Sequence, residues 1–225
     1  MTTSTAPTPS PAPVPPPTTL GEEILLLSLD DTTGEARLPL RTPYAIAAAA
    51  LLERCLSGVA DVAGDTGHTG GSAEAVLPED AGKWIHEHST REYETALRGV
   101  LDKGLIREEK RRVLLVFRTT RYPEADGTAE SALRGRLAEV VLEGAAPDPR
   151  TAALISLLHH GDLHTLAFPD ADSEESPARR RMTEIAEHHW ADPALRRMAD
   201  TAAAAAAALT AATMATTVVI IVAAT

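Results

Sequence analysis

The scarcity of aromatic side chains constrains the fold more than any other feature of the sequence. Phe, Trp and Tyr together make up 3% of the residues, although 44% of the chain is hydrophobic. A core must therefore be built from Ala, Leu, Val and Ile, and a composition of this kind favours helices. The length of 225 residues suits one domain with tails. We expect a mainly α protein, a compact multi-helix single domain with a small β-hairpin element.

The two ends of the chain differ in composition from the middle. Residues 1–19 contain seven prolines and no charged side chain, which is typical of a disordered Pro-rich tail and not of a signal peptide. Residues 20–200 form the expected domain. Residues 201–225 also lack charge, but Ala and Thr dominate them. An apolar, Ala-rich C-terminal helix that packs on the protein is therefore favoured over a membrane anchor.

Capping and breaker residues divide the middle of the chain into elements. The run EEILLLSL is compatible with a buried strand or a short helix. Thr42 is expected to cap one helix, and Ser89 with Glu92 has the capping-box spacing for a second helix, which Gly104 ends. The segment LIREEKRRVLLVF predicts two strands around a turn at Glu108–Lys110. Three further helices are expected within SALRGRLAEVVLEG, TAALISLLHHG and ARRRMTEIAEHHWA.

No group of residues has the spacing of a catalytic centre. Cys55 is the single cysteine, so neither an internal disulfide nor a paired-cysteine zinc site can form. His160 and His164 have the four-residue spacing of metal ligands on a helix, but we expect the helix to end between them, at Gly161. The sequence therefore predicts no enzyme activity, no metal site and no cofactor.

Positive charge is concentrated in one segment, Lys103–Arg121. It carries seven basic and two acidic residues, although the formal net charge of the chain is −11. Three explanations are open: the segment binds nucleic acid, it binds an anionic lipid surface, or it is a solvated hairpin without a function. A helix followed by a charged ribbon is the pattern of a winged helix. The helix before the ribbon, however, mixes Arg91, Arg98 and Lys103 with three acidic residues, which is a poor balance for contact with phosphates.

Four phrases, in this order along the chain, resemble the Golgi phosphoprotein 3 family in its bacterial, actinomycete-like branch. EEILLLSLDDTTGE is similar to the opening segment of the family, and AAAALLERCLSG is similar to its Leu- and Ala-rich helix. LRGVLDKGLIREEKRRVLLVFRTTRYP is similar to its helix, Lys-Gly turn and hairpin. DPRTAALISLLHHGDLHTLAF is similar to a phrase in which His159 and Asp162 match the family's histidine and aspartate. The resemblance covers about residues 20–200.

The resemblance implies a mostly helical, non-enzymatic protein that lies peripherally on membranes and binds phosphatidylinositol 4-phosphate. It implies a cytoplasmic location, an anionic phospholipid or phosphoinositide headgroup as ligand, and short protein tails as clients. A homo-oligomer is compatible with it. Nucleic acid is not an expected partner under this interpretation, and a winged-helix-like DNA-binding regulator is the alternative function.

The residues that bind the headgroup in the family are only partly matched. The family's Trp and one of its arginines correspond to Leu38 and Ala47 in this chain. The arginines nearest to the matching segments are therefore the expected headgroup-binding residues, because a guanidinium pairs well with phosphate oxygens. Several of them would have to converge on one concave patch. They are Arg41, Arg91, Arg98, Arg118 and Arg121.

Overall fold

The computed structural model describes most of the chain between residues 16 and 200. The described residues are 16–30, 33–56, 81–113, 117–125, 127–189, 191–193, 195–196 and 199–200. Most of the expected Pro-rich tail and the whole expected C-terminal helix at 201–225 lie outside them. Within the described residues the fold is mainly helical with one two-stranded hairpin, which confirms the expected fold class. No described helix is both long enough and apolar enough to cross a membrane.

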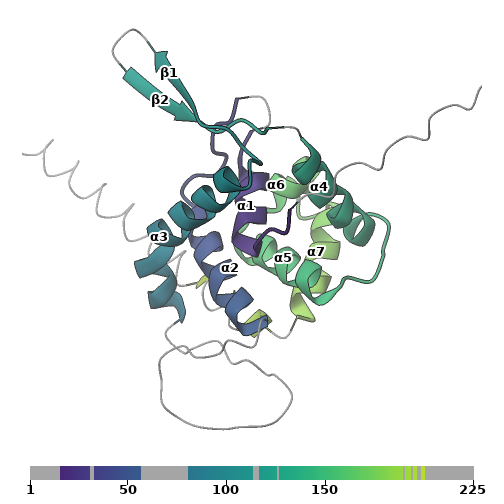
Figure 1. The fold of residues 1–225 in the computed structure, drawn as a ribbon. Coiled ribbons are helices and arrows are strands. Elements are labelled where there is room, and N and C mark those ends of the chain that lie inside the picture. Colours follow the sequence, from purple (N-terminus) through teal and green to yellow (C-terminus); the bar gives the residue numbers. More distant parts are fainter. Residues whose placement is uncertain are drawn as a thin grey trace, which may run out of the picture.

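Helix α1 (Leu20–Ser28) lies at the centre of the domain, between α2 and α3 on one side and α4 and α5 on the other (Figure 1). The segment that could have been a strand or a helix is thus a helix. Thr19 and Glu22 form a capping box that starts it, and all nine of its residues are buried. A helix that is apolar on most of its surface is stable only inside a core, and α1 occupies that position.

Two buried carboxylates of α1 connect it to the surrounding helices. Glu22 accepts a hydrogen bond from Lys103 Nζ at 2.5 Å. Glu23 contacts Arg136 at 2.7 Å and Arg150 at 3.2 Å, and its carboxylate is almost fully buried. Arg150 also donates to the carbonyl oxygen of Thr18, just before the helix. Because each buried carboxylate meets at least one cation, the cost of burying these charges is offset.

Helices α2 (Thr42–Leu56) and α3 (Ala81–Asp102) pack against α1 and against each other. The predicted start of α3 at Ser89 was wrong, since the helix begins eight residues earlier. Ser89 and Glu92 have capping-box spacing, but both are buried inside the helix, and the Ser89 hydroxyl donates to the carbonyl of His86. The Thr42 hydroxyl likewise donates back to the carbonyl of Leu38 at 3.0 Å instead of capping from outside.

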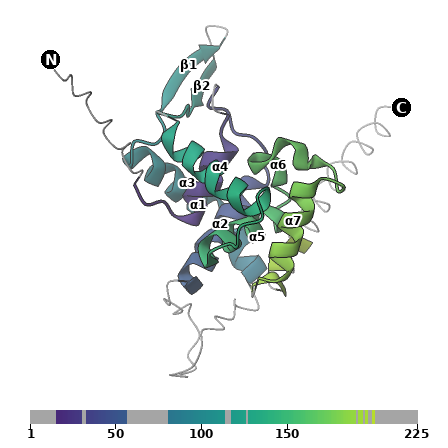
Figure 2. The same cartoon turned by 90° about the vertical axis from the view of Figure 1, so that its right-hand side faces the viewer.

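The hairpin, β1 (Glu109–Val113) and β2 (Phe117–Arg121), stands away from the helices (Figures 1 and 2). The predicted turn at Glu108–Lys110 was wrong, because Glu109 and Lys110 belong to β1, which extends to Val113. A ribbon that projects from the body accepts charged residues along its strands, as β1 does at Glu109 and Lys110. Gly104, at φ +68°, follows the end of α3 as expected.

The base of the hairpin is attached to the loop that follows α1. The backbone N–H of Tyr122 donates to the carbonyl of Gly34 at 2.9 Å. Gly34 has φ +63°, and a Cβ atom there would lie 2.3 Å from the backbone nitrogen of Pro123. Only glycine allows both this conformation and this close approach.

The second half of the domain completes the core. It consists of α4 (Thr128–Val141), α5 (Pro149–His160), α6 (His164–Ala167), the 3₁₀ helix η1 (Pro169–Asp172) and α7 (Pro177–Glu187). Asp148 caps α5 by accepting from the backbone N–H groups of Arg150 and Thr151. The predicted end of that helix at Gly161 is confirmed. α5 and α7 pack closely together, and the buried Leu154 and Met182 belong to the shared core.

Candidate functional site

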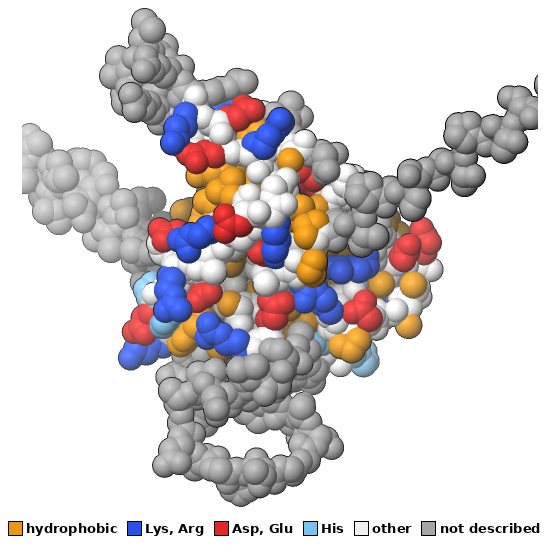
Figure 3. Space-filling view, viewed as in Figure 1, with side chains coloured by type: hydrophobic (Ala, Val, Ile, Leu, Met, Phe, Trp, Pro, Cys, Tyr) orange, Lys and Arg blue, Asp and Glu red, His pale blue; other side chains and the backbone are white. Residues whose placement is uncertain are grey.

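The hairpin is the most basic element of the described chain. Residues 107–121 include six basic and two acidic residues. Lys110 is 72% exposed and contacts Glu108 at 3.1 Å. Figure 3 shows described basic and acidic side chains together on this projection. The excess of positive charge therefore lies on an element that extends into solvent, where it can meet a flat partner without obstruction from the helices.

The strand register sorts the charged positions onto two faces. Lys110 is paired with Thr120, and Arg112 is paired with Arg118. Because directly paired positions share a face, these four strand positions form one face. None of the four is acidic, but Glu108, just before β1, contacts Lys110. Glu109 is paired with Arg121 on the other face. The first face, defined by Lys110, Arg112, Arg118 and Thr120, is called the basic face below.

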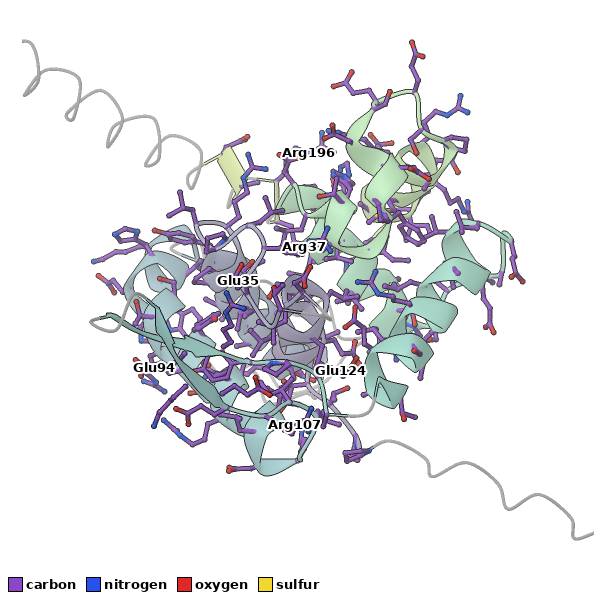
Figure 4. All side chains as sticks on the ribbon, turned by 90° about the horizontal axis from the view of Figure 1, so that it is seen from above. Glu35, Arg37, Glu94, Arg107, Glu124 and Arg196 are labelled. Carbon is purple, nitrogen blue, oxygen red and sulfur yellow. The ribbon has the colours of Figure 1, made fainter. Side chains whose placement is uncertain are left out.

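Arg121 is engaged in the attachment of the hairpin to the body. Its guanidinium donates to Glu35 at 2.6 Å, and its side chain is only 22% exposed. Figure 4 looks down on this end of the molecule and shows Glu35 and Arg37 on the loop after α1, with Arg107 near the base of the hairpin. The side chain of Arg118 lies outside the described part of the structure. Arg121, one of the two expected arginines in β2, is thus held by an ion pair with Glu35.

Arg91 and Arg98 are exposed on the outer face of α3. Arg91 is 70% exposed and lies 3.7 Å from Glu92. The exposed charged residues of this helix alternate in sign along its length, so the face has no net charge. They are Lys83, Glu87, Arg91, Glu94, Arg98 and Asp102. Such a face attracts neither a DNA backbone nor an anionic membrane strongly.

Arg41 lies at a third place, in a cavity of about 450 Å³. It contacts the Asp162 carboxylate closely and donates to the Asp162 carbonyl oxygen at 3.1 Å. Arg179 Nη2 lies 3.8 Å from the same carboxylate. The residues lining this cavity include none of the other four expected arginines. Among the described residues, the five expected arginines are thus divided between the cavity, the outer face of α3 and the hairpin.

Two arginines near aromatic or acidic partners were missed by sequence reasoning. Arg179 is one of three consecutive arginines, and nothing in the sequence separates it from its neighbours Arg180 and Arg181. Arg54 lies over the ring of Trp84, 5.1 Å from the ring centroid, and 3.8 Å from Glu92. A long segment separates α2 from α3, and no spacing in the sequence relates residues of one helix to residues of the other. The contact between Arg54 and Trp84 therefore could not be predicted from the sequence.

The histidines around the end of α5 form a partly buried cluster, in which His164 is the buried member. His159 Nδ1 lies 3.1 Å from His164 Nε2, and His160 Nε2 lies 3.0 Å from Asp192. Because α5 ends at His160, His160 and His164 do not share a helical face. No group of three metal-ligating residues is formed within the described ranges. Burial, together with neighbouring His160 and His164, lowers the pKa of His159 to about 4, so this imidazole is neutral at pH 7.

Comparison with known proteins assigns this arrangement to a family. The family model for Golgi phosphoprotein 3 matches residues 20–202, which include every described helix and the hairpin. Comparison with curated proteins gives no match. The family match covers the same four phrases that suggested the resemblance in the sequence. The chain belongs to the Golgi phosphoprotein 3 family.

Proposed function

We propose that this protein is a non-enzymatic peripheral membrane protein that binds anionic phospholipid headgroups, phosphatidylinositol 4-phosphate among them, and acts as an adaptor. Family membership supports the general role. The observation that carries the proposal is the projecting hairpin, whose basic face has cations at three strand positions, with Glu108 before the strand as the acidic neighbour of Lys110. On this proposal the protein lies on the cytoplasmic surface of a membrane, and short protein tails are its clients.

The strand register places two like charges opposite each other, which favours contact between the hairpin and a negatively charged surface. Arg112 is paired directly with Arg118, and like charges at paired positions destabilise a ribbon. An anionic membrane surface would neutralise this repulsion. Each cation near such a surface contributes about 1 kcal/mol. Three cations on the basic face would therefore give weak, reversible binding that weakens as the salt concentration rises.

The other expected arginines have smaller roles in this proposal. Arg98 lies one turn from the end of α3, on the outer face of that helix where basic and acidic residues are balanced, so its contribution is expected to be small. Arg91 lies two turns further back. Arg121 keeps the hairpin on the body through Glu35. Arg41 belongs to the separate cavity.

The alternating charges of α3 disfavour the alternative function, a winged-helix-like DNA-binding regulator. In that fold the helix before the ribbon enters the major groove and faces phosphates. Here its exposed charged residues are equally basic and acidic. DNA-binding proteins with a basic surface bind random duplex DNA non-specifically at low salt and would give a gel shift. We expect this protein to give no shift.

Vesicle sedimentation tests the membrane proposal directly. The full chain is mixed with phosphatidylcholine vesicles, with vesicles that also contain phosphatidylglycerol, and with vesicles that contain phosphatidylinositol 4-phosphate. We expect binding only to the anionic vesicles. The triple variant Lys110→Gln, Arg112→Gln, Arg118→Gln should lose about 3 kcal/mol of binding free energy, or roughly a hundredfold in affinity.

A second triple variant separates the hairpin from the effect of net charge. Lys83→Gln, Arg91→Gln, Arg98→Gln removes the same number of cations from the balanced face of α3. We expect it to retain most of the binding. Equal losses in the two triple variants would show that the hairpin is not the membrane-binding element, and equal binding to neutral vesicles would contradict the electrostatic mechanism.

A further inference from the structure

The cavity that contains Arg41 combines charged and apolar walls from three separate parts of the chain. Leu38, Leu40 and Arg41 come from the loop before α2, Asp162 from the turn after α5, and Arg179 from α7. Leu40 is 85% exposed, the most exposed of the large hydrophobic side chains in the described residues. A bulky apolar side chain beside two arginines is a setting for a ligand that has an anionic end and an apolar end.

Backbone strain is concentrated at this cavity. In the described residues only two non-glycine residues have positive φ, Leu38 at +49° and Asp162 at +51°, and both line it. The left-handed conformation costs a non-glycine residue about 1–2 kcal/mol. Strained residues persist where the surrounding structure fixes them, and they are concentrated at binding sites. The coincidence of both residues at one cavity therefore points to a ligand.

The side chains around Asp162 are arranged as an oxyanion site. Arg41 contacts one carboxylate oxygen, while Arg179 and His164 lie 3.8 and 3.5 Å from the other. These three groups come from three different elements and converge on a single carboxylate. The Asp162 side chain is 54% exposed, so it can turn outward without opening the core.

We propose that this cavity binds a carboxylate that carries an apolar group, and that the Asp162 carboxylate competes with that ligand for Arg41 and Arg179. The ligand carboxylate would take the place of the Asp162 carboxylate, and its apolar group would lie against Leu38 and Leu40. A monoanion fits better than a phosphate dianion, because Asp162 and Asp172 both line the cavity. The same chemistry is present in a free carboxylic acid and in the C-terminal residue of a polypeptide. This inference goes beyond membrane binding by the hairpin and does not depend on it.

Matched pairs of ligands test the proposal on the unmodified protein. N-acetyl-leucine is compared with N-acetyl-leucinamide, and a short peptide that ends in Leu is compared with its C-terminal amide, each by NMR titration of the full chain. We expect both acids to bind and both amides to fail. Tighter binding of the peptide acid would identify a polypeptide as the source, and equal binding of the two acids would identify a small molecule. Equal binding of acid and amide, or no binding of either acid, would overturn the proposal.

Three single variants test the residue assignment. Asp162→Asn removes the competing charge but keeps a residue that tolerates positive φ. An exposed ion pair contributes up to about 1 kcal/mol, so N-acetyl-leucine should bind roughly two- to fivefold more tightly to this variant. Arg179→Gln should lose binding, and Arg180→Gln, the exposed neighbour on the same helix, should not. Unchanged or weaker binding in Asp162→Asn, or equal effects of the two arginine changes, would refute the assignment.

The test of acid binding in the cavity can be distinguished from the test of vesicle binding by the hairpin. The triple variant of the basic face is expected to bind N-acetyl-leucine as the unmodified protein does. If the unmodified protein binds anionic vesicles but not N-acetyl-leucine, only the cavity proposal fails. If it binds N-acetyl-leucine but no anionic vesicles, only the membrane proposal fails.

Discussion

Acidification should destabilise this protein through the partly buried His159. Its pKa is lowered from 6.5 to about 4 in the folded protein, first by burial and then by His160 and His164. The unfolded chain takes up a proton at this site below pH 6.5, whereas the folded protein does so only near pH 4. Stability from this group is thus complete above pH 6.5, falls as the pH decreases toward 4, and is constant below that.

The size of the effect follows from the shift in pKa. Each pH unit below 6.5 costs about 1.4 kcal/mol until the folded protein is protonated. His159 alone should therefore lower the free energy of unfolding by about 2 kcal/mol between pH 7 and pH 5. Burial also lowers the pKa values of His160, His164 and His189, so the total loss should be larger. A small domain has a total stability of only about 5–15 kcal/mol.

Urea unfolding at pH 7 and pH 5, followed by far-UV circular dichroism, measures this effect. The variant His159→Asn keeps an amide that can meet His164 but removes the titrating group. The loss of stability between the two pH values should be about 2 kcal/mol smaller in the variant than in the unmodified protein. The same loss in both proteins would refute the assignment to His159, and no loss in the unmodified protein would refute the argument from burial.

Two further predictions concern packing and buried charge. Gly34→Ala should destabilise the domain by more than Gly104→Ala: both have positive φ, which costs alanine about 1–2 kcal/mol, but an added Cβ meets Pro123 at position 34 and nothing within 4 Å at position 104. Equal melting temperatures of the two variants would contradict the tight contact at the hairpin base. Glu23→Gln should cost about 2–3 kcal/mol in urea unfolding because it leaves two arginines without their shared buried carboxylate. The control Glu184→Gln, in an exposed pair, should change stability by less than about 0.5 kcal/mol, and an equally small effect of Glu23→Gln would show that the network contributes little.

Local sequence signals predicted the helical fold well where they were unambiguous. The composition, the end of α3 before Gly104 and the end of α5 at Gly161 followed from propensity and chain-breaking residues. The start of α3 did not, because Ser89 and Glu92 have the spacing of a cap but are covered by other helices. A capping box can be recognised only if its residues are at a helix end, and burial in the tertiary structure decides that. The hairpin turn was misplaced because Glu109 and Lys110 belong to the first strand, which continues to Val113.

The candidate sites were less predictable than the fold. The basic segment could be seen in the sequence, but the register that places Arg112 opposite Arg118 depends on where the turn falls. The expected arginines were chosen by proximity to family phrases, which says nothing of the face each occupies. Arg179 could not be predicted as a site residue. Only its proximity to Asp162 in the folded protein distinguishes it from the adjacent Arg180.

Helix α1 is buried on all sides, so it can be fully packed only after helices that are synthesised later. It leaves the ribosome before every other described helix, yet Arg136 and Arg150, which pair with Glu23, follow 113 and 127 residues later. At 5–20 residues per second, roughly 6–25 s pass before both partners have been made. During that interval the apolar residues of α1 cannot be enclosed by α4 and α5. Apolar surface that stays exposed on a nascent chain favours aggregation, so the period of synthesis before the second half emerges is when this chain is most exposed to it.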